Sequence, residues 1–475
     1  MKNRLLYFLL LISTLIWADN NATYENLTLS DALEIVQKDN LEISIAKFDK
    51  DVASLGTKVA NGYSFGKLDA EIMGLRSNDA GNVFGFKLQS REATFGDLGF
   101  SDFLGGISQA ISSSAGDFAT FSQMMSNPQM SDSLLSTIPN DLNFPDTRNH
   151  FDVKLIYMLP LYTGGKLASY RAISKKMVEM KSLDKEKIKA LKIFEVRKTY
   201  YDISLLYKFE KDLELIKNNI EKLRDATISF RQEGYAKETD ILEVESKLSN
   251  VERMFFQAHA NRELSYQFLS FLLNSEVKSI KKVSLEELEC KLTLDEVLDS
   301  NSDIKKAKLG LKIQSKMVDV SRASFKPEVG AFAEYGSSDD KFLNDFKEKD
   351  RYTLGVQAKL NILNGGVDSA KLQQEKIKLL KVKKQVELAS KGISLQYKKI
   401  KTEIFNLDKQ IESIKKEKEL AQKIYTAYQE RYKEGLASIN DVVIKQSLQI
   451  EKLLKLLELQ NSRLQKLLQI QKMAH

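Results

Sequence analysis

The residue types that most often carry enzyme chemistry are few and scattered in this chain of 475 residues. His150, His259 and His475 stand alone, without the spacing of a metal site or a cysteine partner. Residues 164–166 read Gly-Gly-Lys, but a phosphate-binding loop also needs an earlier glycine and a Ser or Thr after the lysine. We therefore predict a protein that is not an enzyme, with no catalytic residue, no cofactor and no metal site.

The charged residues are mixed in sign rather than gathered into one patch. The formal net charge is +7, yet runs such as 415–418 (KKEK) combine lysine with glutamate. Glu412 and Lys416 are four residues apart, a spacing that places both on one face of a helix. This pattern predicts solvated helix surfaces and no nucleic-acid partner.

The first residues predict the compartment. Lys2 and Arg4 precede an apolar run, Leu5–Trp17, and the small residue Ala18 follows it. The run is shorter than the roughly 20 residues that cross a bilayer, which favours a signal peptide over the alternative of a single membrane anchor. We predict that residues 1–18 are a signal peptide that the mature chain lacks.

The rest of the sequence offers no further candidate for a membrane helix, because even the apolar run Phe268–Leu273 is only six residues long. If the mature chain crosses a membrane, it must do so as part of a closed β-barrel. Cys290 is the only cysteine and does not follow the signal peptide. This excludes an intrachain disulfide and a lipid-anchored N-terminal cysteine.

Two glycine motifs occur twice, at one constant offset. The pair Gly164 and Gly165 recurs as Gly365 and Gly366, and Gly234 recurs as Gly435, both at an offset of 201 (365 − 164 and 435 − 234). The distance between the two motifs is therefore 69 residues in each copy (234 − 165 and 435 − 366). A fixed spacing between distant markers predicts a rigid rod whose length matters.

The stretches between these motifs are predicted to be paired helices. Residues 161–326 and 328–475 contain no proline, which favours long helices. Apolar residues in the second copy recur at alternating spacings of 4 and 3, which predicts a left-handed supercoil against a neighbouring helix. These residues are Ile393, Tyr397, Ile400, Ile404, Leu407, Ile411 and Ile414, and the first copy continues the spacing with Leu213, Ile216, Ile220 and Leu223.

Gly234 and Gly435 are predicted to end these helices in the left-handed conformation. Each is followed by a short polar turn and by Asp240 or Asp441 near the start of a returning helix, which makes an αα-hairpin. With a rise of about 1.5 Å per residue, each arm is roughly 100 Å long. Arms of that length are expected to project.

Four other stretches alternate between apolar and polar residues. Strands of about nine residues, apolar on one face, fit a membrane barrel with its apolar face toward lipid. Four strands cannot close a barrel, so several protomers must share one. An ordinary half-buried sheet in a soluble protein is the alternative. The alternating stretches are 68–72, 151–157, 329–335 and 352–360.

The repeat defines the organisation of the chain. The first repeat, 19–274, holds a helix, a strand pair and a helical hairpin, and the linker 275–291 leads to the second repeat, 292–475, with its strand pair at 328–363. The Leu-Thr-Leu at the start of each repeat has an offset of 265 (292 − 27), so the first repeat carries 64 extra residues (265 − 201) before Gly-Gly. We predict that they form an external inserted loop at 78–150.

The ordered set of motifs resembles the TolC-like outer membrane efflux family. The resemblance covers essentially the whole mature chain except the inserted loop. It rests on LTLSDALEIVQKDNLEISI at 27–45, the strand-to-helix junctions LPLYTGGK (159–166) and LNILNGGV (360–367), the tips FRQEGYAKETDIL (230–242) and RYKEGLASINDVV (431–443), and Leu-Leu-Asn at 272–274.

The resemblance implies a mainly α fold with β-strands. A homotrimer would form a twelve-stranded β-barrel in the outer membrane lipid and a long α-helical coiled-coil barrel in the periplasm of a Gram-negative bacterium. It also implies a passive exit duct for efflux or type I secretion, with a periplasmic adaptor and an inner membrane pump of RND or ABC type as partners. A drug, a metal cation, a peptide or a protein could each be the cargo. A periplasmic or surface coiled-coil scaffold is the alternative function, but a scaffold does not require the strands.

The resemblance also assigns roles to residues. The two tips would dock the adaptor, although Tyr235 and Lys237 depart from the small or apolar residues usual there. Asp441, and less closely Asp240, would narrow the periplasmic entrance as a ring of carboxylates. The alternative is that each aspartate only caps a helix. The docking residues implied are Gly234, Tyr235, Ala236, Gly435, Leu436, Ala437 and Ser438, and the junction residues are Gly164, Gly165, Gly365 and Gly366.

Overall fold

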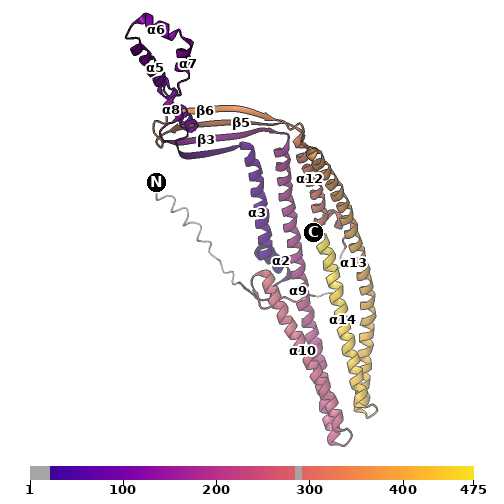
Figure 1. The fold of residues 1–475 in the computed structure, drawn as a ribbon. Helices are drawn as coiled ribbons and strands as arrows, with labels where there is room; N and C mark the ends of the chain where they lie inside the picture. The colour runs from indigo at the N-terminus through magenta and orange to yellow at the C-terminus, as the bar shows by residue number, and fades with distance from the viewer. Residues whose placement is uncertain (1–21, 284–290, 475) are drawn as a thin grey trace. The chain divides into compact units, whose positions relative to one another are not determined.

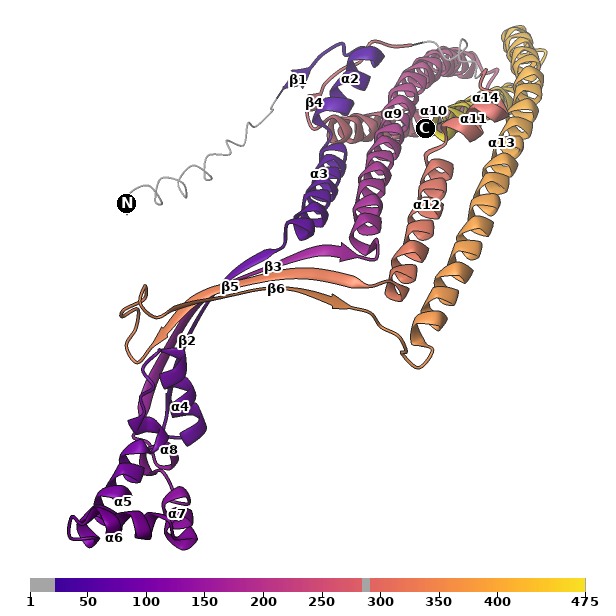
Figure 2. The same ribbon diagram turned by 90° about the horizontal axis from the view of Figure 1, so that it is seen from above.

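The computed structural model describes residues 22–283 and 291–474. The predicted signal peptide and Cys290 lie outside the described residues. The described residues divide into two compact units: a helical unit within Met1–Gly56, Ile173–Ser315 and Lys376–His475, and a strand unit of Thr57–Ala172 and Lys316–Glu375. Figure 1 and Figure 2 show the elements of both. No helix among the described residues combines the length and the apolar character that crossing a bilayer needs.

The strand unit is built on one antiparallel sheet with the strand order β2-β3-β5-β6. The four strands are longer than nine residues. They are β2 (Lys67–Ser77), β3 (Arg148–Thr163), β5 (Glu328–Asp339) and β6 (Asp350–Lys359). In the described chain β2 and β6 are the outer strands, so each has one free edge.

The register confirms that the strands are amphipathic. One row across the sheet runs Ala70, Leu155, Tyr335 and Tyr352, each residue directly opposite the next. The adjacent row points to the other face and is polar, since Glu71 lies opposite Lys154 with 3.5 Å between Oε2 and Nζ. The predicted apolar and polar faces are therefore continuous across all four strands.

The second strand pair ends at Lys359, four residues before the predicted end at 363. Strand β6 stops at Lys359, so residues 360–363 are not in a strand. The amide side chains of Asn361 and Asn364 donate hydrogen bonds to Asp368 at 2.7 and 3.2 Å. These bonds stabilise a turn into the next helix, which is why the strand does not continue.

The inserted segment of the first repeat, predicted as an external loop over 78–150, contains short helices. Strand β3 begins at Arg148, within the predicted loop. Asp79, Asp117 and Asn127 each accept a hydrogen bond from a backbone N–H of the helix that follows. These caps start short helices in a Gly- and Ser-rich segment. The helices are α4 (Ala80–Gln89), α5 (Phe100–Ser113), α6 (Phe118–Met125), α7 (Pro128–Leu135) and α8 (Asn140–Asn143).

Two helical hairpins dominate the helical unit. Both long helices have 67 residues and start and end at an offset of 201 (367 − 166 and 433 − 232). The returning helices also begin at that offset (439 − 238). The first hairpin is α9 (Lys166–Gln232) and α10 (Glu238–Leu273), and the second is α13 (Val367–Lys433) and α14 (Ile439–Met473).

The predicted apolar seams pack the helices together. Leu213, Ile216, Ile220 and Leu223 are buried in one cluster that contains residues of both hairpins. In the second hairpin Ile400 and Ile404 are buried, and Ile411 is half-buried against a neighbouring cluster. Burial of each apolar side chain contributes about 1.5–3 kcal/mol, so these seams account for much of the association between the helices.

The single helix predicted at the start of each repeat is two helices separated by a buried asparagine. The side-chain amide of Asn40 donates to the carbonyl of Leu272, and that of Asn301 donates to the carbonyl of Met473, both at 2.8 Å. The side-chain oxygen of Asn40 accepts the backbone N–H of Ile43 at 3.2 Å, and that of Asn301 accepts the backbone N–H of Ile304 at 3.1 Å. These N–H groups belong to the first turn of the next helix. The helices are α2 (Leu29–Asp39) and α3 (Leu41–Gly62), then α11 (Leu294–Ser300) and α12 (Ser302–Arg322).

Part of the predicted linker is also ordered. Strand β4 (Glu276–Val277) pairs in parallel with β1 (Thr23–Tyr24), and Leu27 forms an isolated bridge with Ile280. The buried hydroxyl of Tyr200 donates to the carbonyls of Leu27 and Lys281 at 2.9 and 2.5 Å. The start of the first repeat is thus fastened to the end of its own hairpin.

Candidate functional site: the hairpin tips

Each long helix ends in a glycine with positive φ. The φ angles are +83° at Gly234 and +74° at Gly435, where a side chain would be strained. The following residue donates its N–H to a carbonyl five positions back, Tyr235 to Phe230 at 2.7 Å and Leu436 to Arg431 at 2.8 Å. This Schellman arrangement satisfies the last carbonyls of the helix and turns the chain.

The returning helices start with capping interactions that use the two candidate gate aspartates. In the second tip, Asp441 Oδ2 accepts from the backbone N–H of Ser438 at 3.1 Å and from its hydroxyl at 2.6 Å, and the N–H of Asp441 donates back to that hydroxyl oxygen at 3.2 Å. In the first tip, Asp240 Oδ2 accepts the N–H of Lys237 at 2.9 Å. Because Lys237 has no side-chain acceptor, the first tip has only half of this capping box.

Both aspartates are the third residue of their helix rather than the capping residue itself. The hydrogen bonds from the Ser438 hydroxyl and backbone lower the pKa of Asp441 below its ordinary value of 3.8. The carboxylate of Asp441 is therefore ionised at neutral pH, and it remains only half-buried. It can cap its helix and still present negative charge to solvent.

The tips expose apolar side chains beside a groove. Tyr235 is 83% exposed and Leu436 is 65% exposed, whereas Ala236 and Ala437 are half-buried. The groove has a volume of about 620 Å³ and lies between the two tips. Its walls include apolar Phe230, Tyr432 and Ile439 and charged Glu233, Lys237, Asp240, Lys433 and Glu434.

A buried contact joins the two hairpins just above this groove. The hydroxyl of Tyr432, on α13, donates to Thr227 Oγ1, on α9, at 3.1 Å. The ring of Tyr432 meets that of Phe230 edge-on, with 5.5 Å between ring centroids. This hydrogen bond and this aromatic contact therefore attach the two hairpins to each other near the tips, together with the apolar cluster they share.

The four junction glycines also have positive φ, from +52° at Gly365 to +91° at Gly165. Only glycine fits at Gly164, because a Cβ atom there would lie 2.8 Å from the carbonyl oxygen of Ala323. The Gly-Gly motif is thus a tight turn between a strand and a long helix. It makes no contact that indicates ligand binding among the described residues.

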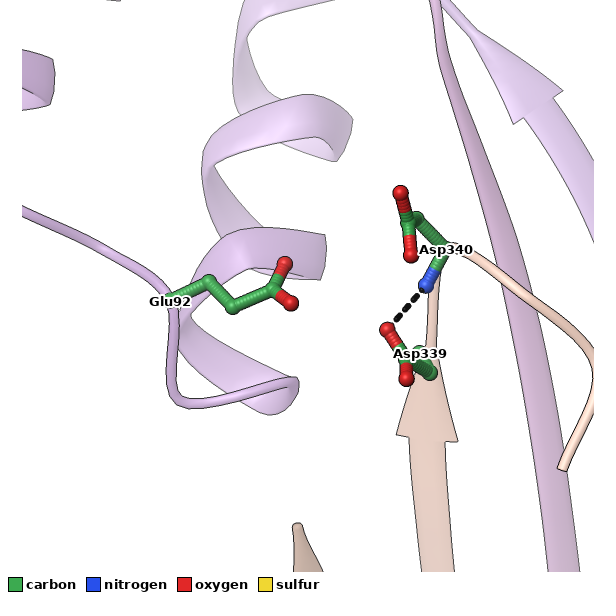
Figure 3. Close-up of side chains that lie close together, drawn as sticks. All are labelled: Glu92, Asp339 and Asp340. Carbon is green, nitrogen blue, oxygen red and sulfur yellow. Dashed lines mark hydrogen bonds between the residues drawn. The ribbon is translucent and has the colours of Figure 1, made fainter. Parts of the chain in front are cut away.

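One group of carboxylates in the strand unit could in principle hold a cation. Glu92, Asp339 and Asp340 have oxygens within 4.8 Å of one another. Figure 3 shows the Asp340 N–H pointing at Asp339, to which it donates at 2.7 Å. Lys349 already bonds to Glu92 and lies 2.8 Å from Asp339 Oδ1, and Arg148 bonds to Glu92. These two cations compensate Glu92 and Asp339, two of the three carboxylates. We therefore interpret the group as an ion-pair network that fastens the insertion to the β5–β6 loop.

Two sets of positioning residues were missed in the sequence. The positions of Asn40 and Asn301 could have been predicted, because the same local pattern surrounds both. Each asparagine is followed two residues later by an acidic residue and three residues later by isoleucine, as Asn-Leu-Glu-Ile and Asn-Ser-Asp-Ile. The pair Tyr432 and Thr227 has no such signal. The two residues are 205 positions apart in the sequence, and their contact is not repeated between the two copies.

The sequence comparison identifies the second repeat. Residues 293–474 match the family model described as outer membrane efflux protein. A search of curated protein sequences finds no match.

The fold is similar to those of solved outer membrane proteins. The Campylobacter jejuni CmeC outer membrane channel is 14% identical with a TM-score of 0.72, covering 94% of this chain and 85% of that one. The outer membrane protein VceC of Vibrio cholerae is 12% identical with a TM-score of 0.72, covering 94% of this chain and 96% of that one. The open state of the Neisseria gonorrhoeae MtrE outer membrane channel is 15% identical with a TM-score of 0.67, covering 94% of this chain and 88% of that one. The second repeat thus matches the outer membrane efflux protein family, and the fold of the described chain is similar to those of solved outer membrane channels.

Proposed function

We propose that the protein is the outer membrane exit duct of a tripartite efflux or type I secretion system. The observation that carries the proposal is the equality of its two arms. Helices α9 and α13 each have 67 residues and end in the same Gly turn and capping aspartate. Equal arms place both tips of a protomer at one depth, which a shared entrance requires.

A homotrimer is supported by two surfaces that lack a partner within the described chain. The free edges of β2 and β6 run antiparallel to each other, so β2 of one copy can pair with β6 of the next. Three copies would close a barrel of twelve strands and leave no edge in the outer membrane. The apolar strand face would then lie against lipid.

Helix α3 provides the second unpartnered surface. Its exposed apolar residues recur at spacings of 4 and 3, the pattern of a coiled-coil seam. A further set of exposed apolar residues lies along α13. The exposed apolar residues of α3 in one copy can pack against those of α13 in the next copy. The α3 residues are Leu41, Ile45, Phe48, Val52, Leu55 and Val59, and those of α13 include Ile377, Leu380, Leu388 and Leu395.

The tips are the proposed docking site of a periplasmic adaptor. Tyr235 and Leu436 project beside a groove with apolar and charged walls, a combination suited to the end of another helical hairpin. Because the described chain has no nucleotide-binding loop, the energy for transport would come from an inner membrane pump of RND or ABC type. The passive role also explains why we expect no enzyme activity.

Asp441 is proposed to narrow the entrance of the assembled trimer. Three symmetry-related carboxylates would attract cations, and Asp240 would add to their field. The lowered pKa of Asp441 keeps this ring charged at neutral pH. The capping role described above is compatible with this one, since both use the ionised carboxylate.

The proposal is tested by purification and electrophysiology. The protein should require detergent, run as a trimer that heat dissociates, and form channels in planar lipid bilayers. A coiled-coil scaffold would instead be water-soluble and would not conduct. A water-soluble monomer without conductance would contradict the exit-duct function.

A further inference from the structure

The inserted segment contains a lobe that lacks a hydrophobic core of its own. We define the insertion lobe as residues 93–147, which include helices α5 to α8 and lie beyond the ends of β2 and β3 in Figure 2. Only two apolar side chains of this lobe are buried, those of Ala110 and Leu134. A segment of this size needs more buried apolar area to be stable alone.

Large apolar side chains cover the outside of the insertion lobe instead. Phe118 is 80% exposed, and Phe95, Leu135 and Phe144 are each 76% exposed. Scattered single residues of this kind would need no explanation, but their number in one small lobe predicts a binding surface. The remaining exposed members are Leu98, Phe100, Leu104, Ile111 and Ile138.

Specific close contacts nevertheless hold the lobe in one conformation. Gly99 has a φ of +80°, and an added Cβ would lie 2.3 Å from Pro139 Cβ. A Cβ on Gly106 would lie 2.5 Å from Leu134 Cδ2. Asp102 Oδ2 accepts the backbone N–H of Asn140 at 2.8 Å. The exposed apolar surface is therefore a feature of a defined shape.

The charge of the insertion lobe limits the nature of its partner. The lobe has no lysine or arginine, although the chain has 72. Its charged residues are six aspartates, at positions 97, 102, 117, 132, 141 and 146. Asp97 is paired with Lys87, and the other five make the surface acidic. This surface would be repelled by the phosphates of lipid headgroups, and three such lobes would repel one another. The partner surface should be apolar with lysine or arginine.

The proposed trimer brings one such surface to the lobe. The insertion follows the last residue of β2, whose free edge would pair with β6 of the next copy. The β5–β6 loop, residues 340–349, lies at the same end of the sheet, because Ser77 is opposite Arg148 and Ser337 is opposite Asp350. The adjacent copy's loop would end one strand spacing from β2, about 4.8 Å. The chain's own loop is bonded to the base of the insertion, where the Arg91 guanidinium donates to the carbonyl of Glu348 at 3.0 Å and Lys349 pairs with Glu92.

The β5–β6 loop has the complementary side chains. Phe342 and Leu343 are 53% and 54% exposed, and Lys341 and Lys347 are also exposed. Lys349, by contrast, is held within its own chain by Glu92 and Asp339. The loop thus presents exposed apolar residues that match the apolar surface of the lobe. Its two exposed lysines are accompanied by Asp340, Asp345 and Glu348.

We propose that the insertion lobe docks on the β5–β6 loop of the adjacent copy and clamps the outer ends of the sheets in the trimer. This interface rests on the trimer of the proposed function. It buries the exposed aromatic residues of the lobe, which supply the core that the lobe lacks. It also explains why an insertion occurs beside the free edge of β2.

The proposal is tested by thiol cross-linking in the full chain with Cys290→Ser as background. Leu343→Cys is combined in turn with Phe95→Cys, Phe118→Cys and Phe144→Cys, and a short bis-maleimide is added to the detergent-solubilised trimer. We expect covalent dimers and trimers on denaturing gels for at least one combination. Each single-cysteine variant is the control and should remain monomeric on such gels. Cross-links that are only intrachain, or absent for all three combinations, would overturn the proposal.

A charge variant gives an independent measurement that does not depend on the cysteines. Lys341→Glu with Lys347→Glu should lower the temperature at which the trimer dissociates by several degrees while single-channel conductance is retained. Adding Asp132→Lys and Asp146→Lys to that variant should raise the dissociation temperature most of the way back to that of the unmodified trimer. An unchanged dissociation temperature in a conducting trimer would contradict the clamp alone. Absence of a trimer and of conductance in the unmodified protein would instead contradict the proposed function.

Discussion

The hydroxyl of Tyr432 donates a hydrogen bond of 3.1 Å to Thr227 Oγ1, and both side chains are buried between the two hairpins. Thr227 in turn donates to the carbonyl of Leu223 at 2.8 Å, so the bond continues into the backbone of α9. The second hairpin is thereby attached to the first a few residues above the tips. Any movement that separates the tips must break this contact.

Tyr432→Phe should therefore loosen the tips without unfolding the hairpins. Loss of the hydroxyl removes about 1 kcal/mol of attachment and leaves the ring in place against Phe230. We expect a higher open probability in planar bilayers. Tyr428→Phe is the matched control, because Tyr428 is also on α13 and its ring lies against Arg431 of α13 and Lys445 of α14, within the second hairpin. Equal open probabilities for Tyr432→Phe and the unmodified channel would show that this bond does not restrain the tips.

Asn301→Ala should destabilise the second repeat. The substitution leaves the carbonyl of Met473 and the N–H groups of Asp303 and Ile304 without their buried partner, at a cost of about 2 kcal/mol. Loss of helical circular dichroism should occur at a lower temperature. Asn440→Ala, at an exposed position of the tip, should leave that temperature unchanged. If the two variants melt alike, the asparagine between α11 and α12 has no stabilising role.

The capping and gating roles of Asp441 can be separated with two substitutions. Ser438→Ala removes the hydroxyl half of the cap, typically worth about 1 kcal/mol, but keeps the negative charge. Asp441→Asn removes the charge. If the carboxylates form an entrance ring, block of the channel by multivalent cations should weaken in Asp441→Asn and persist in Ser438→Ala. Equal block in both variants would leave Asp441 with the capping role alone.

The same ring has a predictable pH dependence. Hydrogen bonds from Ser438 lower the pKa of Asp441, so its contribution to the cap is present above the ordinary value of 3.8 and is lost as pH falls through the lowered pKa. Cation block should therefore persist down to about pH 4 and disappear below it. The pH at which block is half lost should rise in Ser438→Ala, because that variant lacks the hydrogen bond that lowers the pKa. A half-loss above pH 5 in the unmodified channel would be inconsistent with Asp441 as the titrating group.

The hairpins and strands could be predicted because their signals are periodic. The apolar spacing through Ile400 and Ile404 and the alternation around Leu155 each repeat many times, and the offset of 201 aligns the two copies. The helices of the insertion could not, because each is short, and α4, α6 and α7 each start at a single capping side chain such as Asp117. The contact between Tyr432 and Thr227 depends on how two hairpins pack, which no local pattern encodes.

The last prediction concerns the shape of the second tip. Proline cannot replace Gly435, because its ring fixes φ near −65° whereas Gly435 has a φ of +74°. It would also remove the N–H that donates to the carbonyl of Tyr432 at 3.0 Å. Gly435→Pro should therefore displace Leu436 and Ala437 and abolish export in cells, while trimers still form in the outer membrane. Gly392→Ala is the control, since no side chain or neighbouring backbone approaches that position in α13. Normal transport by Gly435→Pro trimers would show that the adaptor does not dock on this turn.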